Sequence, residues 1–192
     1  MIANMITGLG LIIAVWFNIL LFTGPQNPLF MLIVALAIGL TDFLDGYIAR
    51  VLSIVSDLGK TLDRLRDKVF ILPFLGKEML ALRGSEEFIE SAVVGTISII
   101  LAAEAGIIIL WIKGVLMKGD VGSHISGKIK TTLCTLAVLL MLSHDFYIKN
   151  FGSDEAIYFV FKFAILAVLF LGAVFAIWSF FNYIKRYSEY GG

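Results

Sequence analysis

Six long apolar stretches alternate with short polar connections along this chain of 192 residues. About 20 consecutive apolar residues are enough to cross a bilayer as a helix. The pattern therefore predicts an all-α integral membrane protein with six transmembrane helices. The expected spans are Ile6–Phe22, Leu29–Arg50, Leu58–Leu75, Ile89–Ile112, Thr131–Ser143 and Ala156–Asn182. The fifth span is short unless it begins near Ser126.

Composition supports a membrane protein. Hydrophobic residues make up 59% of the chain and charged residues only 16%, whereas soluble domains contain about 45–50% apolar residues. The formal net charge is zero, so no nucleic-acid partner is expected. The single cysteine, Cys134, excludes a disulfide within the chain and is expected to be a small buried side chain. No repeat or change in composition divides the sequence, which predicts one membrane domain over residues 1–192.

The basic residues are distributed unevenly between the two sides of the predicted bundle. Of the 15 Lys and Arg residues, eleven flank one side and three flank the other. Since cytoplasmic loops are enriched in Lys and Arg, we expect a multi-pass protein of the cell membrane with both termini in the cytoplasm. The N-terminus has no charged region or cleavage site typical of a signal peptide, so we expect a retained first helix. Lys162, inside the last span, is expected to extend its amino group to the membrane surface.

One segment at the cytoplasmic side is unusually charged. It reads "DFLDGYIARVLSIVSDLGKTLDRLRDK" and covers residues 42–68. A charge at the centre of a bilayer costs roughly 2.5–3.5 kcal/mol on insertion scales, so intramembrane charges usually have a function. At about 100° per residue, one helix face gathers the first two aspartates, two small residues and an arginine. These are Asp42, Asp45, Gly46, Ala49 and Arg50.

The next predicted helix carries a second acidic stripe, in which Gly59, Asp63 and Asp67 share a face. The linker between the two helices is short, so they are expected to be antiparallel neighbours whose stripes face each other. Converging carboxylates repel unless they are protonated, paired with arginine or bound to divalent cations. An all-oxygen ligand set suits Mg²⁺, Mn²⁺ or Ca²⁺.

Space and positive charge beside these carboxylates indicate a phosphate ligand. Gly46 and Ala49 let a ligand approach the backbone, and Arg50 is placed to meet a phosphate. Two hard cations beside an arginine would form a pyrophosphate site.

These residues spell Asp42-x2-Asp45-Gly46-x2-Ala49-Arg50-x8-Gly59-x3-Asp63-x3-Asp67. The spacing resembles the signature of the CDP-alcohol phosphatidyltransferase family at every fixed position, and the opening "NMITGLG" resembles that family's N-x-x-T-x-x-[RG]. The resemblance implies a phospholipid-synthesising enzyme that transfers a phosphatidyl group from CDP-diacylglycerol to an alcohol and releases CMP.

The resemblance also implies roles for the signature residues. Asp42, Asp45 and Asp63 would hold two divalent cations, Mg²⁺ or Mn²⁺. Asp67 would be the general base and a further metal ligand. The CDP moiety would be bound by Gly46, Ala49, Arg50 and Gly59. Members of the family are often homodimers, so the resemblance makes a homodimer a candidate assembly and leaves the oligomeric state open.

Two downstream segments suggest a branch of the family. "AAE" at 102–104 and "GKIKT" at 127–131 resemble the A-R-E and G-K-x-K-T elements of bacterial phosphatidylglycerophosphate synthases. The acceptor expected from this resemblance is glycerol 3-phosphate, contacted by Arg66, Glu104 and Lys128. The alternative for Glu104 is a structural ion pair.

The sequence also departs from that branch. Ala103 stands where the branch has arginine, and Arg64 and Arg66 replace its proline and small residue. Inositol phosphate, serine or another alcohol therefore remains an alternative acceptor. A non-enzymatic transporter or scaffold is an alternative of another class, although the clustering of the acids at one rim and the intact signature favour an enzyme.

Overall fold

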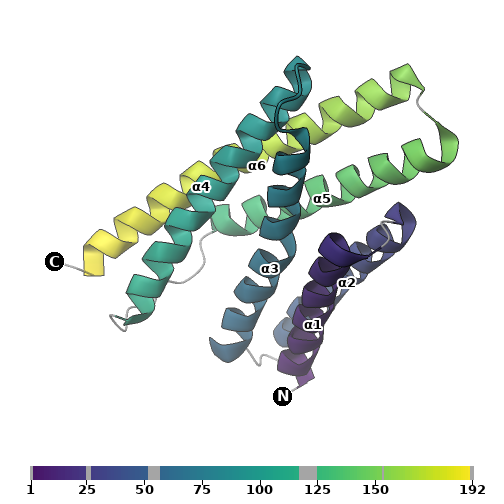
Figure 1. Cartoon of the computed structure of the whole chain (residues 1–192). Helices are drawn as coiled ribbons and strands as arrows, with labels where there is room; N and C mark the ends of the chain where they lie inside the picture. Colours follow the sequence, from purple (N-terminus) through teal and green to yellow (C-terminus); the bar gives the residue numbers. More distant parts are fainter. Residues whose placement is uncertain (1, 25–26, 52–56, 117–124, 153, 191–192) are drawn as a thin grey trace. The chain divides into compact units, whose positions relative to one another are not determined.

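The computed structural model describes residues 2–24, 27–51, 57–116, 125–152 and 154–190. All regular secondary structure in these ranges is α-helical, as the sequence predicted (Figure 1). The helices are α1 (Ile2–Thr23), α2 (Pro28–Val51), α3 (Asp57–Leu82), α4 (Phe88–Leu116), α5 (Ile125–Phe151) and α6 (Glu155–Tyr190).

Each predicted span falls on one of these helices, but fewer of them are long and apolar enough to cross a membrane. Within the described residues, four segments meet that requirement: Met5–Thr23, Phe88–Lys113, Ile125–Phe151 and Glu155–Ser188. Helix α2 contributes a shorter apolar segment, Pro28–Leu44. The structure thus supports an integral membrane protein, and the crossing of the bilayer by α2 and α3 stays a prediction.

The helices form two compact units. One contains Met1–Leu75 and Val138–Tyr158, and the other contains Gly76–Ala137 and Phe159–Gly192. Helices α3, α5 and α6 each contribute residues to both units. The expectation of a single domain stays a prediction, and each unit is described by itself.

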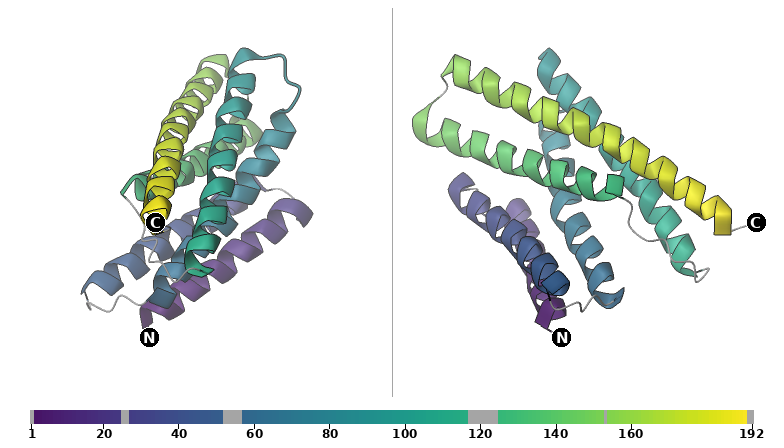
Figure 2. Two further views of the ribbon diagram at one scale, coloured as in Figure 1. Left: turned by 90° about the vertical axis from the view of Figure 1, so that its left-hand side faces the viewer. Right: turned by 180° about the vertical axis from the view of Figure 1, so that it is seen from behind.

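In the first unit, α1 packs against both α2 and α3. Helices α1 and α2 lie side by side in every view (Figure 1, Figure 2). The fully buried ring of Phe17 contacts Phe70 and Phe74 of α3, with ring centroids 5.2 Å and 6.1 Å apart. The side-chain amide of Asn18 donates a hydrogen bond to the Val69 carbonyl at 2.6 Å. These contacts fix α3 against α1 and so position the acidic ends of α2 and α3.

In the second unit, small residues let the helices approach closely. A Cβ added at Gly106 of α4 would overlap the ring of Phe180 in α6. A Cβ at Gly172 of α6 would make only ordinary van der Waals contact, 3.6 Å from Ile100 and 3.7 Å from the Cys134 sulfur, so the tight approach is at Gly106. Close helix contact at small residues is the usual packing in membranes. Cys134 is buried, as predicted.

Lys162 has two partners that the sequence did not predict. Its side chain is buried and its amino group donates hydrogen bonds to Glu87 at 2.6 Å and Glu90 at 2.5 Å. The expectation that Lys162 extends to the membrane surface stays a prediction. A buried amine is stabilised by paired carboxylates, and here they lie near the start of α4.

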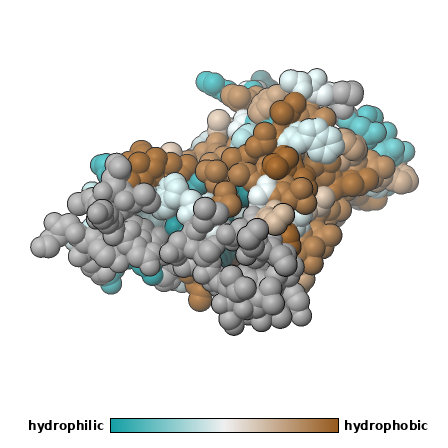
Figure 3. Space-filling view, turned by 90° about the horizontal axis from the view of Figure 1, so that it is seen from below, coloured by the Kyte–Doolittle hydropathy of each residue, from teal (hydrophilic) through white to brown (hydrophobic). Residues whose placement is uncertain are grey.

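Large apolar side chains are exposed on many helices. Examples are Ile12 of α1 (67% exposed) and Phe163 and Phe181 of α6 (59% and 62%). Figure 3 shows hydrophobic side chains over much of the face in view. Helices that are apolar on the outside as well as the inside are typical of a lipid environment.

Replacing Phe17 by alanine is expected to destabilise the first unit by about 3 kcal/mol, because the substitution removes the ring contacts with α3 and leaves a cavity. Phe22→Ala on the same helix removes a ring that is 63% exposed and is the matched control. Thermal unfolding of both variants in detergent measures the difference. Equal melting temperatures for the two variants would contradict the packing of α1 on α3.

Candidate functional site

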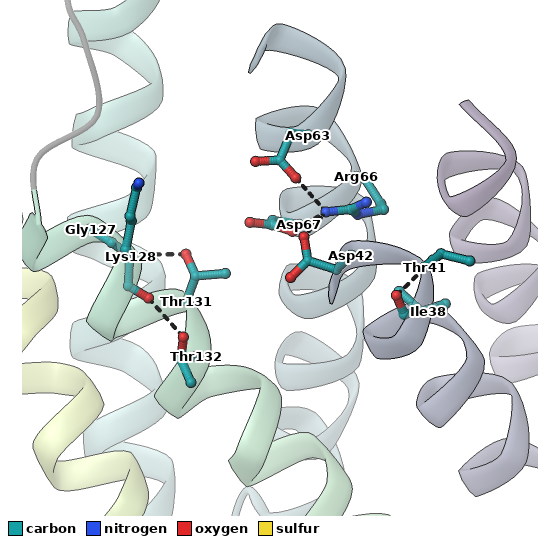
Figure 4. Close-up of polar contacts among 10 residues, drawn as sticks. All are labelled: Ile38, Thr41, Asp42, Asp63, Arg66, Asp67, Gly127, Lys128, Thr131 and Thr132. Carbon is teal, nitrogen blue, oxygen red and sulfur yellow. Dashed lines mark hydrogen bonds and ion pairs between the residues drawn. The ribbon is translucent and has the colours of Figure 1, made fainter. Parts of the chain in front are cut away.

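Three carboxylates converge in the first unit (Figure 4). Asp42 lies towards the C-terminal end of α2, and Asp63 and Asp67 lie one turn apart on α3. One oxygen from each lies within 4.8 Å of the others. The expectation that the two acidic stripes face each other is met by these residues, called the aspartate cluster below.

The rest of the predicted site lies beside this cluster in the chain. Asp45, Gly46, Ala49 and Arg50 are within helix α2, but their side chains are outside the described residues. Gly59 is half-buried in the first turn of α3. The roles of these residues in binding metal and CDP stay predictions.

Arg66 of α3 is the partner of the aspartate cluster. Its side chain is fully buried and donates hydrogen bonds to Asp42 and Asp63. The same nitrogen lies 3.5 Å from the Asp67 carboxylate. The carboxylates are 55%, 46% and 28% exposed in the order Asp42, Asp63 and Asp67. The guanidinium is thus buried, while part of each carboxylate is exposed.

Sequence reasoning assigned Arg66 to the acceptor and did not predict these ion pairs. One signal was present, since Asp63 and Arg66 are three residues apart on a helix, a spacing that favours pairing. The contacts with Asp42 depend on the packing of α2 against α3. The predicted contact of Arg66 with an acceptor phosphate is a separate matter and stays a prediction.

Helix α1 leaves room for the Arg66 side chain. A Cβ added at Gly10 would lie 2.9 Å from the Thr41 hydroxyl oxygen and 3.0 Å from Cδ of Arg66. The Thr41 hydroxyl donates to the Ile38 carbonyl at 2.7 Å. Gly10 ends the "NMITGLG" segment, so this opening motif packs directly beside the arginine that contacts the cluster.

The donor set of the cluster fits a hard divalent cation. All three candidate ligands are carboxylates, and they carry three negative charges when ionised, against one positive charge on Arg66. Mg²⁺ and Mn²⁺ prefer carboxylate oxygens, whereas zinc sites usually include His or Cys. The exposed parts of the carboxylates are accessible to a cation from solvent.

Glu104 and Lys130 form a buried ion pair in the second unit. The Lys130 amino group of α5 donates to the Glu104 carboxylate of α4, and both residues are buried. Lys130 is the second lysine of "GKIKT" and was not named as a partner from the sequence. The other lysine of this motif, Lys128, is exposed, and its carbonyl accepts a hydrogen bond from Thr132 at 3.1 Å (Figure 4).

Comparison with known proteins decides the family. A family model described as CDP-alcohol phosphatidyltransferase matches residues 1–180. The chain belongs to the CDP-alcohol phosphatidyltransferase family. This confirms the resemblance inferred from the signature.

A curated relative of this CDP-alcohol phosphatidyltransferase family member comes from Aquifex aeolicus (strain VF5). It is named CDP-diacylglycerol–glycerol-3-phosphate 3-phosphatidyltransferase, and it is 48% identical to the chain over 52 residues. That segment is 27% of this chain and 29% of the relative. The similarity therefore covers less than a third of the relative's length.

Breaking the Glu104–Lys130 pair is expected to be strongly destabilising. Glu104→Ala or Lys130→Ala alone removes a direct partner of a buried charge and should cost about 3–5 kcal/mol. The double variant removes both charges and should be less destabilised than the sum of the two single variants. Thermal unfolding of the four proteins in detergent measures this coupling, and additive effects would contradict a direct pair.

Proposed function

We propose that this protein transfers a phosphatidyl group from CDP-diacylglycerol to glycerol 3-phosphate, giving phosphatidylglycerophosphate and CMP. The observation that carries the proposal is the convergence of Asp42, Asp63 and Asp67 at the spacing of the family signature. The name of the Aquifex relative supports glycerol 3-phosphate as the acceptor.

The aspartate cluster would hold divalent cations, with Asp45 as a further ligand by resemblance. Two cations, Mg²⁺ or Mn²⁺, would neutralise the pyrophosphate and the CMP leaving group. The exposure of the three carboxylates supports this role, because cations held at their exposed side would lie between the carboxylates and an arriving pyrophosphate.

Asp67 would be the general base. Its contact with Arg66, at 3.5 Å, is longer than those of Asp42 and Asp63. It is therefore the carboxylate least engaged by the guanidinium and retains lone pairs for a proton. Asp67 would remove the proton from the acceptor hydroxyl, whose oxygen attacks the phosphorus joined to diacylglycerol. The bond from this phosphorus to CMP breaks, and CMP leaves with the electron pair.

The remaining signature residues would bind the nucleotide. Gly46 and Ala49 would let the cytidine diphosphate approach the α2 backbone, and Arg50 would contact a phosphate. Lys128 is exposed and supports a contact with the acceptor phosphate. Glu104 is half of a buried pair, so any contact with the acceptor would also involve Lys130.

In the membrane, α2 and α3 would add two spans to the four apolar segments, with both termini and the aspartate cluster at the cytoplasmic side of the cell membrane. The apolar segment Pro28–Leu44 and the distribution of Lys and Arg support this topology. This arrangement places the cluster where a soluble acceptor and a lipid donor can meet. A homodimer is a candidate assembly by resemblance to the family.

The reaction can be tested with the purified full chain in detergent and labelled CDP-diacylglycerol. CMP release is expected with Mg²⁺ or Mn²⁺ and glycerol 3-phosphate, and not with inositol phosphate, serine or inositol. EDTA should abolish it. Release with a different acceptor would contradict the proposed acceptor, and no release with any acceptor would favour a transporter or scaffold.

The variant Asp67→Asn tests the general base. Losing the base should lower kcat by about 100-fold or more, with little change in KM for CDP-diacylglycerol. Asp145→Asn, which removes an exposed carboxylate of α5, is the matched control and should retain activity. Wild-type turnover by Asp67→Asn would rule out the assigned role.

A further inference from the structure

We propose that Arg66 is a built-in counter-ion of the aspartate cluster. Its guanidinium holds the three carboxylates together before a cation binds, and it lowers their affinity for divalent cations by competing for the same oxygens. The inference rests on the proposed function only in taking the cluster as the cation site. Arg66 is thus a positioning residue that sets how tightly the cations are held.

The aspartate cluster brings three like charges close together. Asp42, Asp63 and Asp67 place three carboxylates within 4.8 Å of one another, and like charges at such distances repel strongly. Arg66 donates to two of them and approaches the third, so one positive charge is shared among all three. A protein with this arginine can keep its acidic ligands close together without a metal.

The guanidinium and a bound cation compete for the same carboxylates. An oxygen that accepts a charge-assisted hydrogen bond has less negative charge to offer a metal ion. The guanidinium and a divalent cation also repel each other across this short distance. Each bound cation therefore loses part of the attraction that three free carboxylates would provide.

Because Arg66 is buried, we expect its charge to weaken cation binding more than the charge of an exposed arginine would. Solvent and salt weaken the influence of an exposed charge, but the Arg66 side chain is fully buried beside Gly10 and Thr41. Arg64 is half-buried and lies two residues away, about 200° around the same helix. Replacing Arg64 changes the net charge by the same amount as replacing Arg66, so Arg64 provides the matched control.

The test is an Mn²⁺ titration of the purified full chain in detergent, followed by the electron paramagnetic resonance signal of free Mn²⁺. Arg66→Gln should bind Mn²⁺ at least about tenfold more tightly than the wild type. Arg64→Gln should change the affinity by less than about threefold, and Arg66→Lys should lie nearer to the wild type than Arg66→Gln does. Asp63→Asn should bind more weakly and verifies that the titration reports on the cluster.

Thermal unfolding of the same variants provides a second measurement. In EDTA, Arg66→Gln should melt at a lower temperature than the wild type, because its carboxylates have lost the positive charge of Arg66. Saturating Mn²⁺ should raise its melting temperature more than that of the wild type. If Arg66→Gln is stable only with Mn²⁺, the protein is prepared in Mn²⁺ and its affinity is measured by competition with a chelator of known affinity.

Unchanged or weaker Mn²⁺ binding by Arg66→Gln would overturn the inference, since Arg66 would then act only as an anchor for the ligands. An equal gain in Arg64→Gln would also overturn it, because net charge alone would explain the result. CMP release by the wild type is measured on the same preparation. Mn²⁺ binding without CMP release would contradict the proposed function while leaving the comparison of the variants decisive for Arg66.

Discussion

The ion pairs between one covered guanidinium and three carboxylates are the interaction on which the described site depends. Asp42 comes from α2, and Asp63 and Asp67 come from α3, so their repulsion would separate the two helices if nothing opposed it. Arg66 opposes this repulsion with a fully buried side chain, whose charge solvent does not screen. The carboxylates keep their outward side for a ligand. Charge balance and helix packing are therefore one problem at this site.

The same constraint governs the second unit. Glu104 pairs with Lys130 between α4 and α5, and Lys162 of α6 pairs with two glutamates near the start of α4. Charges in an apolar environment are costly unless they are paired. The described helices meet this requirement by joining different segments of the chain, so these pairs also specify which helices are neighbours.

Part of the fold and site followed from sequence pattern alone. The length of each apolar stretch predicted a helix, and the spacing of Asp42, Asp63 and Asp67 predicted a shared site because helical periodicity fixes the face of each residue. The boundaries were less accurate. Helix α5 begins at Ile125, six residues before the predicted span, because the polar segment "SGKIK" lowers the hydropathy there without preventing a helix.

The sequence by itself determined the all-helical class, the membrane character and the residue types of the site, since these depend on composition and on periodicity within single helices. Tertiary structure decided which charged residues form ion pairs with one another. Arg66 was assigned to a substrate and Lys162 to the membrane surface, and the ion pairs that both form with acidic residues were not predicted. The contacts of Arg66 with Asp42 and of Lys162 with Glu87 bridge 24 and 75 positions of the chain. Such pairs depend on which helix faces meet, and local sequence spacing does not encode that choice.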